Sequence, residues 1–528
     1  MNPFPHITVM TLVPIIGAIL IALLPAGGRD GAPSASAINV WPRRFGILTS
    51  LVALLMAISL WVRFDATNSE LQFVERYAWI PGLGVQYFVG VDGLGLVMVA
   101  LTALVVPFAL FAADRDLANS RAFIALMLLL EAGLFGAFTA LNFVHWFIFW
   151  ELSLVPAYFL IKLWGGPNRT AAATQFFIYT LVGSVTMLLG FMAIYLSVGS
   201  FDFFELAEKV RGVEGGLEAF FVAKLGAVAT PDTLAILVFV GVGLGFAVKV
   251  PLFPFHTWLP NTYAEAPSTV TMVLTGVMSK MGVYGLLRIL LPLFPAQMRP
   301  MLTPLLWLAV ATIVFSAFAA FAQRDLKRVF AYSSINHLGY CLLGIFAVAK
   351  WTQNEPAWIE QKAAALNGVV LQMFNHGITA AALFCFIALI ERRTGTRGLD
   401  DFGGLRKVAP VFCGLMGISV FASLGLPGLN GFTGEFLIFK GAFPLASWAT
   451  VLSAAGLLVT AVFLLTFLQR VFHGPLNPSR SGFADLTTAE RCLLAPAVAL
   501  MFVIGIYPQW LLHVINPSVM QLVSHLAN

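Results

Sequence analysis

Seven ionisable side chains stand where this 528-residue chain is otherwise almost entirely apolar, and they are the first candidates for chemistry. They are Glu131, Glu151, Lys249, Lys280, His337, His376 and Glu435. Each lies near the middle of an apolar run, where a charge costs about 2.5–3.5 kcal/mol on membrane-insertion scales. Carboxyl, amine and imidazole groups can each give and take a proton near neutral pH once their surroundings shift their pKa values. The set therefore predicts a proton relay.

Any one of these residues alone could belong to an internal ion pair that only fixes helix packing. Seven in one chain, of both signs and with two histidines, favour the relay. Glu131 receives no role in this interpretation. Asp92, at the outer end of the third apolar run, is interpreted as a cap or an anchor.

Prolines mark two of the segments that carry these residues. Lys249 is followed by Pro251 and Pro254 in FAVKVPLFPFHTWLP, and Pro427 with four glycines precedes Glu435 in FASLGLPGLNGFTGEF. Proline removes a backbone donor and clashes with the preceding turn, so both helices should break near mid-membrane. A plain packing kink is the alternative. A break beside an ionisable residue, found twice, favours a functional site.

The composition indicates the solvent in which these segments fold. Hydrophobic residues make up 59% of the chain and charged residues 10%, whereas a soluble globular protein carries about 25% charged residues. This excludes an ordinary soluble enzyme and a disordered chain, and it indicates a polytopic membrane protein. The net charge of +5 is explained by loops that collect Lys and Arg on the cytoplasmic side, so no nucleic-acid partner is expected.

Fourteen runs approach the length of about 20 apolar residues that a helix needs to cross the hydrocarbon core. They are 6–25, 45–63, 90–113, 121–141, 143–163, 174–198, 233–255, 266–291, 301–322, 327–348, 363–390, 410–440, 448–470 and 490–512. The first run is followed, not preceded, by positive charge, so it is interpreted as a retained span and not as a signal peptide. The expected fold class is all-α, a bundle of about 14 transmembrane helices with breaks in the seventh and twelfth.

Loop charges predict the orientation. An even number of spans puts both termini on one side of the membrane. If that side is outside, eighteen of the thirty Lys and Arg fall in inside loops and nine in outside loops. This asymmetry places both termini outside, in the periplasm of a bacterium.

The two breaks also predict internal symmetry. The seventh and twelfth helices are five apart, so they cross the membrane in opposite directions, which is typical of inverted repeats in transporters. The expected organisation is three N-terminal helices (1–120), a first repeat of helices 4–8 (121–291), a second repeat of helices 9–13 (301–472), and helix 14 with a C-terminal tail (490–528).

No motif for a resident cofactor is found. The four cysteines have no metal-ligand spacing and are interpreted as small buried hydrophobes; they are Cys341, Cys385, Cys413 and Cys492. No phosphate-binding loop, haem-attachment motif or zinc-protease motif is present. We therefore expect no cofactor and no metal in this chain, and transport must be driven by an ion gradient or by a partner.

Four stretches resemble the antiporter-like subunits of complex I, the proton-pumping NADH:quinone oxidoreductase. They are FWELSLVPAYFLIKLWGG (149–166), FAVKVPLFPFHTWLPNTYAEAPSTV (246–270), FAQRDLKRVFAYSSINHLGY (321–340) and LPGLNGFTGEF (426–436). The resemblance covers nearly the whole chain and extends to subunits of Mrp-type Na⁺/H⁺ antiporters and membrane hydrogenases. In this family the M-type chain carries glutamate in the broken twelfth helix, where the L-, N- and Mrp-type chains usually carry lysine. Glu435 and the short segment after helix 14 therefore indicate the M-type.

The resemblance implies a role for each matching residue. Glu151 and Lys249 match the input ion pair, Lys280 the central relay lysine, His337 and His376 the bridging imidazoles, and Glu435 the terminal exchange site. The sequence departs from the family where Asn261 replaces a frequent aspartate and Tyr263 a frequent histidine. No relay residue is placed there.

The resemblance also implies partners and a location. Flavin, iron–sulfur clusters and quinone are expected in partner subunits, with L-type and N-type chains, small membrane subunits, a peripheral redox arm and lipid around this chain. The expected location is an energy-transducing membrane, bacterial inner or thylakoid-type. The electron donor stays open among NADH, ferredoxin and a reduced deazaflavin. Two alternatives also remain: a subunit of an Mrp-type antiporter or membrane hydrogenase, and a structural membrane anchor.

Overall fold

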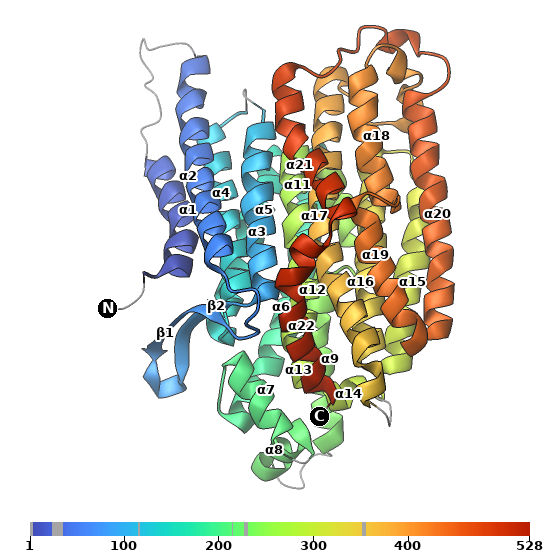
Figure 1. Cartoon of the computed structure of the whole chain (residues 1–528). Coiled ribbons are helices and arrows are strands. Elements are labelled where there is room, and N and C mark those ends of the chain that lie inside the picture. The colour runs from blue at the N-terminus through green and yellow to red at the C-terminus, as the bar shows by residue number, and fades with distance from the viewer. Residues whose placement is uncertain are drawn as a thin grey trace.

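Long apolar helices form a single bundle in the computed structural model (Figure 1). The structure describes residues 4–23, 35–114, 117–213, 215–225, 231–350 and 355–527. Within these residues, 13 helices are long and apolar enough to cross a membrane. The expected all-α polytopic bundle is confirmed. Arg29 and Arg115, two of the arginines behind the predicted orientation, lie outside the described residues.

The N-terminal half of the bundle contains helices α1 to α10. They are α1 (His6–Leu23), α2 (Ala35–Arg63), α3 (Gly93–Ala112), α4 (Ser120–Thr139), α5 (Phe143–Trp164), α6 (Arg169–Val198), α7 (Phe203–Arg211), α8 (Gly216–Leu225), α9 (Pro231–Lys249) and α10 (Trp258–Glu265). Helices α7 and α8 form the polar insert between the sixth and seventh predicted spans and lie at one end of the molecule (Figure 1).

The C-terminal half contains helices α11 to α22. They are α11 (Ser268–Val273), α12 (Lys280–Gly285), α13 (Leu291–Leu293), α14 (Pro295–Met298), α15 (Leu302–Phe321), α16 (Leu326–Val348), α17 (Ile359–Thr394), α18 (Pro410–Leu424), α19 (Asn430–Leu445), α20 (Ser447–Phe472), α21 (Thr488–Ile506) and α22 (Gln509–Ala527). Two π-helical turns, η3 (Leu274–Met278) and η4 (Leu286–Leu290), join α11, α12 and α13 into the eighth predicted span.

Both predicted helix breaks are present. Helix α9 ends at Lys249 and α10 begins at Trp258, so Pro251 and Pro254 lie in the gap between them. Helix α18 ends before Pro427, and α19 begins after it. The predicted run 410–440 is therefore two shorter helices and not one kinked helix.

Besides the short helices between the predicted spans, two elements were not predicted. Residues 72–91 form an antiparallel hairpin of β1 (Gln72–Ile80) and β2 (Val85–Val91). The side chain of Glu75 in β1 accepts hydrogen bonds from the backbone of Ile7 (2.9 Å) and Thr8 (3.3 Å), which ties the hairpin to the start of α1. The second element is α22, which occupies the predicted C-terminal tail.

Helix α22 packs against α3 and α17. The Ser518 hydroxyl accepts a 2.9 Å hydrogen bond from the Gly93 backbone at the start of α3, and Asn367 of α17 donates to Asn516 at 2.8 Å. The tail is therefore part of the bundle. The C-terminal end of α22 lies near α7, and the start of α1 lies near the hairpin. Both termini therefore lie toward the same end of the bundle (Figure 1).

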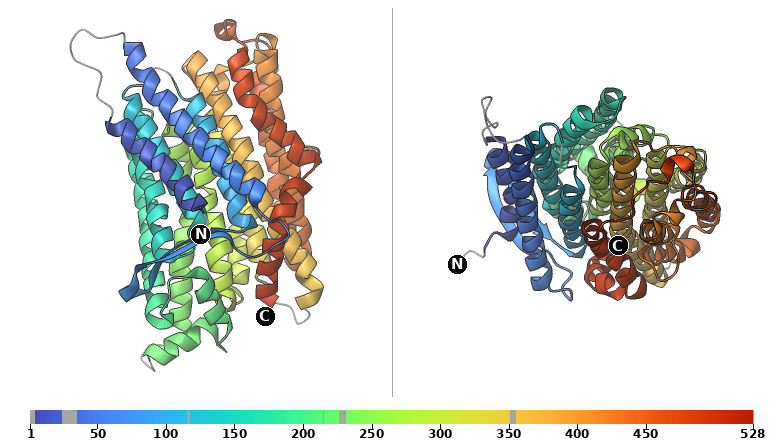
Figure 2. Two further views of the ribbon diagram at one scale, coloured as in Figure 1. Left: turned by 60° about the vertical axis from the view of Figure 1, so that its left-hand side comes forward. Right: turned by 90° about the horizontal axis from the view of Figure 1, so that it is seen from above.

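The ionisable residues lie in the most enclosed part of the bundle. Helices α16 and α17 and the segment Ser268–Leu293 are almost completely buried, whereas α2, α6 and α21 leave most of their apolar residues uncovered. Figure 2 shows the N-terminal helices, coloured blue, at one edge of the bundle. The uncovered faces suit lipid or partner chains, and the enclosed centre is where a buried polar path can exist.

Candidate functional site

Four of the seven predicted residues form a row of neighbours in the centre of the bundle. Lys280 Nζ lies 2.7 Å from His376 Nδ1, the rings of His376 and His337 are 5.2 Å apart between centroids, and His337 Nδ1 lies 3.0 Å from Glu435 Oε1. They come from α12, α17, α16 and α19 in that order. Their side chains are buried, with 0–7% of each residue exposed. The row therefore crosses four helices inside the core of the bundle.

The π-helical turn before Lys280 shapes one end of this row. Lys280 Nζ donates to the backbone carbonyl of Thr275, within that turn, and lies 3.3 Å from the Ser279 hydroxyl. With His376 Nδ1 these make three acceptors for the three donors of an ammonium group. A charged Lys280 therefore requires His376 to accept through Nδ1 and to carry its own proton on Nε2.

Two glycines permit the approach of α17 to this turn. Gly377 follows His376, and a Cβ added to it would lie 2.6 Å from the carbonyl oxygen of Gly276 in the π-helical turn. That distance is shorter than any ordinary carbon–oxygen contact. Without glycine at this position, α17 would have to move away from the turn, and the Lys280–His376 contact would lengthen.

The break between α18 and α19 shapes the other end of the row. Gly425 has a φ of +80°, which favours glycine, and a Cβ there would lie 2.7 Å from Glu435 Oε2. Gln372 of α17 donates to Glu435 Oε1 at 3.2 Å. His337 Nδ1 is at ion-pair distance from that oxygen without the alignment of a hydrogen bond. Its Nε2 pairs with the Ser423 hydroxyl at 3.0 Å.

Lys249 and Glu151 lie together but are not directly paired. Lys249 is 2% exposed, and its Nζ lies 4.9 Å from the ring centroid of Trp150. Within the described part of the chain, Lys249 Nζ and Glu151 Oε1 have no hydrogen-bond partner. Glu151 follows Trp150 on α5, is half-buried and still attracts the ammonium electrostatically. The structure thus holds a buried lysine beside a carboxylate that is not in contact with it.

A small cavity lies between Lys249 and the start of the row. Its volume is about 10 Å³, and its lining includes Lys249, Tyr263 and Ser279. That space is about what one water molecule needs, provided that polar partners surround it. An amine and two hydroxyl-bearing side chains supply such partners, and Ser279 already contacts Lys280.

The backbone groups freed by the break after Lys249 form hydrogen bonds with side chains of other segments. The Trp258 indole donates to the Val248 carbonyl at 3.0 Å, and the Phe253 backbone donates to the Thr312 hydroxyl of α15 at 3.0 Å. Backbone groups freed by a break in a membrane must find partners in the protein. The break is therefore a stable feature, with Lys249 at the C-terminal end of α9, where a cation is favoured.

Two acidic residues lie apart from this row. Glu131 of α4 is fully buried and accepts a 2.7 Å hydrogen bond from the Ser50 hydroxyl of α2; it has no contact with the row in the described part of the chain. Asp92 accepts from the Gly95 backbone at the start of α3 and pairs with Arg288 at 2.5 Å. The interpretation of Asp92 as a cap or anchor is confirmed, and it serves as both.

The site includes side chains that sequence reasoning missed. They are Ser279, Gln372 and Ser423, which contact Lys280, Glu435 and His337. Neutral polar residues are frequent in membrane helices as packing contacts, so their type alone gave no signal. Ser279 alone could have been found from the sequence, because it directly precedes Lys280.

The cysteines are distributed differently from the expectation. All four are free; Cys341 and Cys385 are buried as predicted, Cys413 is half-buried, and Cys492 is exposed on α21. The prediction was wrong for Cys492, because α21 turns an apolar face outward and exposure in a membrane protein does not require a polar side chain. No group of three or more His, Cys, Asp or Glu side chains that could hold a metal occurs among the described residues.

Fold and site together define a class of protein. Titratable residues buried between helices, beside two interrupted helices, are the arrangement of membrane proteins that move ions. Residues 140–463 match the family described as NADH:quinone oxidoreductase/Mrp antiporter, transmembrane. The chain belongs to this family and is a multi-pass membrane protein.

Its relatives narrow the family to one branch. The chain is 34% identical over 520 residues to NADH-quinone oxidoreductase subunit M of Rhodobacter capsulatus, covering 98% of this chain and 96% of that one. The subunit M of Mycobacterium tuberculosis is 33% identical over 555 residues, with 98% and 94% covered. These matches support the M-type assignment made from Glu435.

Solved structures agree with the fold. A chain of respiratory complex I from Thermus thermophilus with bound NADH superposes with a TM-score of 0.82 at 28% identity, covering 99% of this chain and 100% of that chain. A chain of the Mrp complex from Dietzia sp. has a TM-score of 0.81 at 20% identity, with both chains fully covered. The second likeness concerns the fold alone.

Proposed function

We propose that this chain is the M-type membrane subunit of an NADH:quinone oxidoreductase and that it translocates protons along the buried row. The observation that carries the proposal is the succession of Lys280, His376, His337 and Glu435 across four helices. Relatives named as subunit M and the match to a chain of complex I support the same assignment. Flavin, iron–sulfur clusters and quinone belong to partner subunits in this proposal.

The proposed path begins at Glu151 and Lys249. A redox reaction in the partner subunits moves Glu151 relative to Lys249. When the carboxylate moves away, the buried ammonium loses its counter-charge, and a low-dielectric surrounding then favours release of its proton. The unpaired state of the two side chains and the partial exposure of Glu151 support this role.

From Lys249 the proton passes through the cavity lined by Tyr263 and Ser279 to Lys280. The cavity volume of about 10 Å³ suits one water molecule as the intermediate carrier. The proton then crosses the two imidazoles to Glu435. Proton transfer requires heavy atoms within about 2.6–3.2 Å or one bridging water, so the 2.7 Å and 3.0 Å contacts are within range.

We infer that both termini face the outside of the membrane. The termini lie toward the end that carries the hairpin and α7, and arginine-rich loops lie at the other end, where Arg324 and Arg470 approach Asp400 at 3.3 and 3.6 Å. The excess of Lys and Arg in the loops of that second end supports its placement in the cytoplasm.

Lys280→Met tests the proposal, with Lys440→Met as the matched control. Methionine is unbranched like lysine and one atom shorter, and it has no proton to transfer. Lys440 is an exposed lysine of α19. In proteoliposomes that contain the whole complex, we expect Lys280→Met to lower the number of protons moved per quinone reduced, or the turnover, and Lys440→Met to leave both unchanged. A fully assembled Lys280→Met complex with wild-type pumping and turnover would support the structural-anchor alternative instead.

A second candidate is a subunit of an Mrp-type antiporter, because the matching family includes both NADH:quinone oxidoreductase and Mrp antiporter chains. The composition of the native assembly separates the two. The C-terminus would be tagged, the assembly extracted gently from native membranes, and the co-purifying proteins identified by mass spectrometry. Recovery of flavin and iron–sulfur subunits with L-type and N-type chains supports the redox-driven pump and identifies the donor. Recovery of Mrp-like membrane chains only would mean that the choice based on Glu435 is wrong.

A further inference from the structure

Three consecutive residues of α17 contact three different parts of the bundle. His376 lies between Lys280 and His337 in the buried row. Gly377 packs against the π-helical turn before Lys280. Asn375, on the other side of His376, contacts the start of α19. Asn375 carries no proton in the proposed path, but it ties the helix of His376 to the helix that holds the end of the row.

Asn375 and Asn430 bind each other's backbone. Asn375 Nδ2 donates to the Asn430 carbonyl at 2.6 Å, and Asn430 Nδ2 donates to the Asn375 carbonyl at 3.1 Å. Both residues are 0% exposed. Because each bond starts from a different helix, sliding α19 along α17 lengthens or misaligns at least one of them. The pair therefore sets the register of the two helices.

Two threonines extend this contact. The Thr379 hydroxyl of α17 donates to Asn430 Oδ1 at 3.3 Å and accepts from Asn430 Nδ2 at 3.2 Å. The Thr433 hydroxyl of α19 donates to the Asn430 carbonyl at 2.8 Å and accepts from Asn375 Nδ2 at 3.4 Å. We call Asn375, Thr379, Asn430 and Thr433 the amide cluster. It lies at the break itself, so the first turn of α19 is held by α17.

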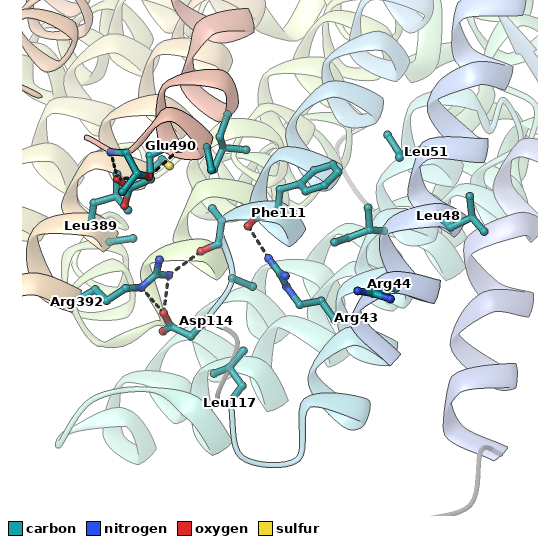
Figure 3. A pocket seen from close by; sticks show the side chains of 18 of the residues that line it. Arg43, Arg44, Leu48, Leu51, Phe111, Asp114, Leu117, Leu389, Arg392 and Glu490 are labelled. Carbon is teal, nitrogen blue, oxygen red and sulfur yellow. Dashed lines mark hydrogen bonds and ion pairs between the residues drawn. The ribbon is translucent and has the colours of Figure 1, made fainter. Parts of the chain in front are cut away.

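The other polar contacts of α17 fix different parts of the helix. At its inner end, Arg392 pairs with Asp114 at 2.5 Å (Figure 3). Two turns beyond the row, Asn367 donates to Asn516 of α22 at 2.8 Å. Both contacts join α17 to segments other than α19.

A third polar contact does reach α19, but it fixes the backbone less firmly. Gln372 donates to Glu435 Oε1 at 3.2 Å. A hydrogen bond between two long side chains can follow a shift of the backbone by rotation of their single bonds. The amide cluster cannot do so, because each of its central bonds ends on a backbone carbonyl.

We propose that Asn375 and Asn430 are positioning residues for proton transfer, which hold His376 and Glu435 at the separation that His337 bridges. The inference rests on the proposed proton path. Direct transfer requires heavy atoms within about 2.6–3.2 Å, and His337 Nδ1 now lies 3.0 Å from Glu435 Oε1. A misplacement of about 1 Å takes a step out of that range and can lower its rate about a hundredfold.

Asn375→Ala and Asn430→Ala, alone and combined, test the positioning role in the complete complex. Proton uptake and quinone reduction are measured in proteoliposomes and divided by the amount of this subunit present. We expect each single variant to lower proton flux per assembled complex about a hundredfold. The double variant should fall no further than the weaker single variant, because the two amides share one set of hydrogen bonds.

The matched control is Asn367→Ala, which removes an asparagine of the same helix from its contact with Asn516. It should pump as the wild type does. The ratio of pumping rates in H₂O and D₂O separates positioning from damage to folding. A lengthened proton transfer limits turnover and raises this ratio, whereas a loss of folded complex leaves it at the wild-type value.

Thr379→Val is the milder variant for the case in which the alanine variants do not assemble. Valine has the shape of threonine without its hydroxyl. Loss of one hydrogen bond from the amide cluster should lower proton flux about fivefold. Wild-type flux in an assembled Thr379→Val complex would then contradict the positioning role.

Three results with the alanine variants would overturn the proposal. They are wild-type flux per assembled complex, a double variant that loses the product of the two single losses, and a reduced flux with an unchanged ratio in D₂O. Lys280→Met, measured beside them, separates this proposal from the proton path. If Lys280→Met stops pumping while the asparagine variants pump normally, only the positioning role is wrong; if Lys280→Met also pumps normally, the path itself is wrong.

Discussion

Replacing His337 by glutamine separates proton transfer from helix packing. His337 is the only member of the buried row that lies beside both another imidazole and the terminal carboxylate, at 5.2 Å from the His376 ring and 3.0 Å from Glu435 Oε1. An amide can still bond the Ser423 hydroxyl, which now lies 3.0 Å from Nε2. It cannot bind and release a proton near neutral pH. His337→Gln therefore removes the relay chemistry and keeps the polar contact.

The expected loss of proton flux follows from the contribution of a single proton-transfer group. A positioned proton-transfer group contributes about 10²–10⁴-fold to a rate, which corresponds to about 2.7–5.4 kcal/mol of barrier. We expect proton flux through this chain to fall by at least about a hundredfold on that basis. Exchanging one neutral hydrogen bond for another changes stability by no more than about 1.5 kcal/mol, so the complex should still assemble.

The assay measures proton uptake and quinone reduction together in proteoliposomes that contain the whole complex. His145→Gln is the matched control. His145 is a buried histidine of α5, 5% exposed, whose ring lies 4.6 Å from Tyr87 and 5.0 Å from Phe149. It has no contact with the row within the described residues. We expect the control to keep wild-type pumping.

The decisive quantities are the number of protons moved per quinone and the turnover. We expect one or both to fall in His337→Gln and neither to fall in His145→Gln. A fully assembled His337→Gln complex that pumps at the wild-type ratio and rate would refute the reasoning, because the proton would then reach the outside without this imidazole. Equal losses in both variants would show that the loss comes from packing.

Two further predictions concern positions that hold the row in place. Gly425→Ala should abolish most pumping, because a Cβ at this position would lie 2.7 Å from the carboxylate of Glu435. The control is Gly474→Ala, where φ is +85° and no atom lies within 4 Å of the added Cβ, so it should cost only the backbone penalty of about 1–2 kcal/mol that both variants share. Equal pumping in the two variants would contradict this prediction. Asp92→Asn should lower the free energy of unfolding of the assembled subunit by about 3–5 kcal/mol, because it leaves Arg288 buried without a counter-charge. Thermal melting of the complex measures this change. An unchanged melting midpoint would show that the ion pair contributes nothing to stability.

Spans and breaks were predictable because the membrane leaves few alternatives. An apolar run of sufficient length must become a helix in lipid. The two close prolines Pro251 and Pro254, and Pro427 among glycines, disfavour its continuation, whereas single prolines such as Pro107 and Pro156 lie inside unbroken helices. The hairpin at 72–91 and helix α22 lie outside or at the edge of that constraint. Their hydrophobic signal is short, and their formation depends on contacts far along the chain, such as Glu75 with the start of α1.

The residue types of the site were predictable, but its contacts were not. An ionisable residue in the middle of an apolar run is conspicuous in the sequence, because inserting it into a membrane costs free energy. All six proposed relay residues were found in this way. Which of them touch depends on how each helix rotates. The π-helical turn before Lys280 and the close approach at Gly377 decide that rotation, and neither follows from the 3.6-residue period of an ordinary helix.

The proposed repeats divide the path between the two halves of the chain. Lys249 and Lys280 fall in the proposed first repeat and His376 and Glu435 in the second, so the 2.7 Å contact between Lys280 and His376 is the point where the path passes from one half to the other. Each half contributes one broken helix, with Lys249 at the first break and Glu435 beyond the second. Neither half holds a complete path. The backbone contact at Gly377 that brings the halves together is therefore as necessary to the proposed function as any titratable group.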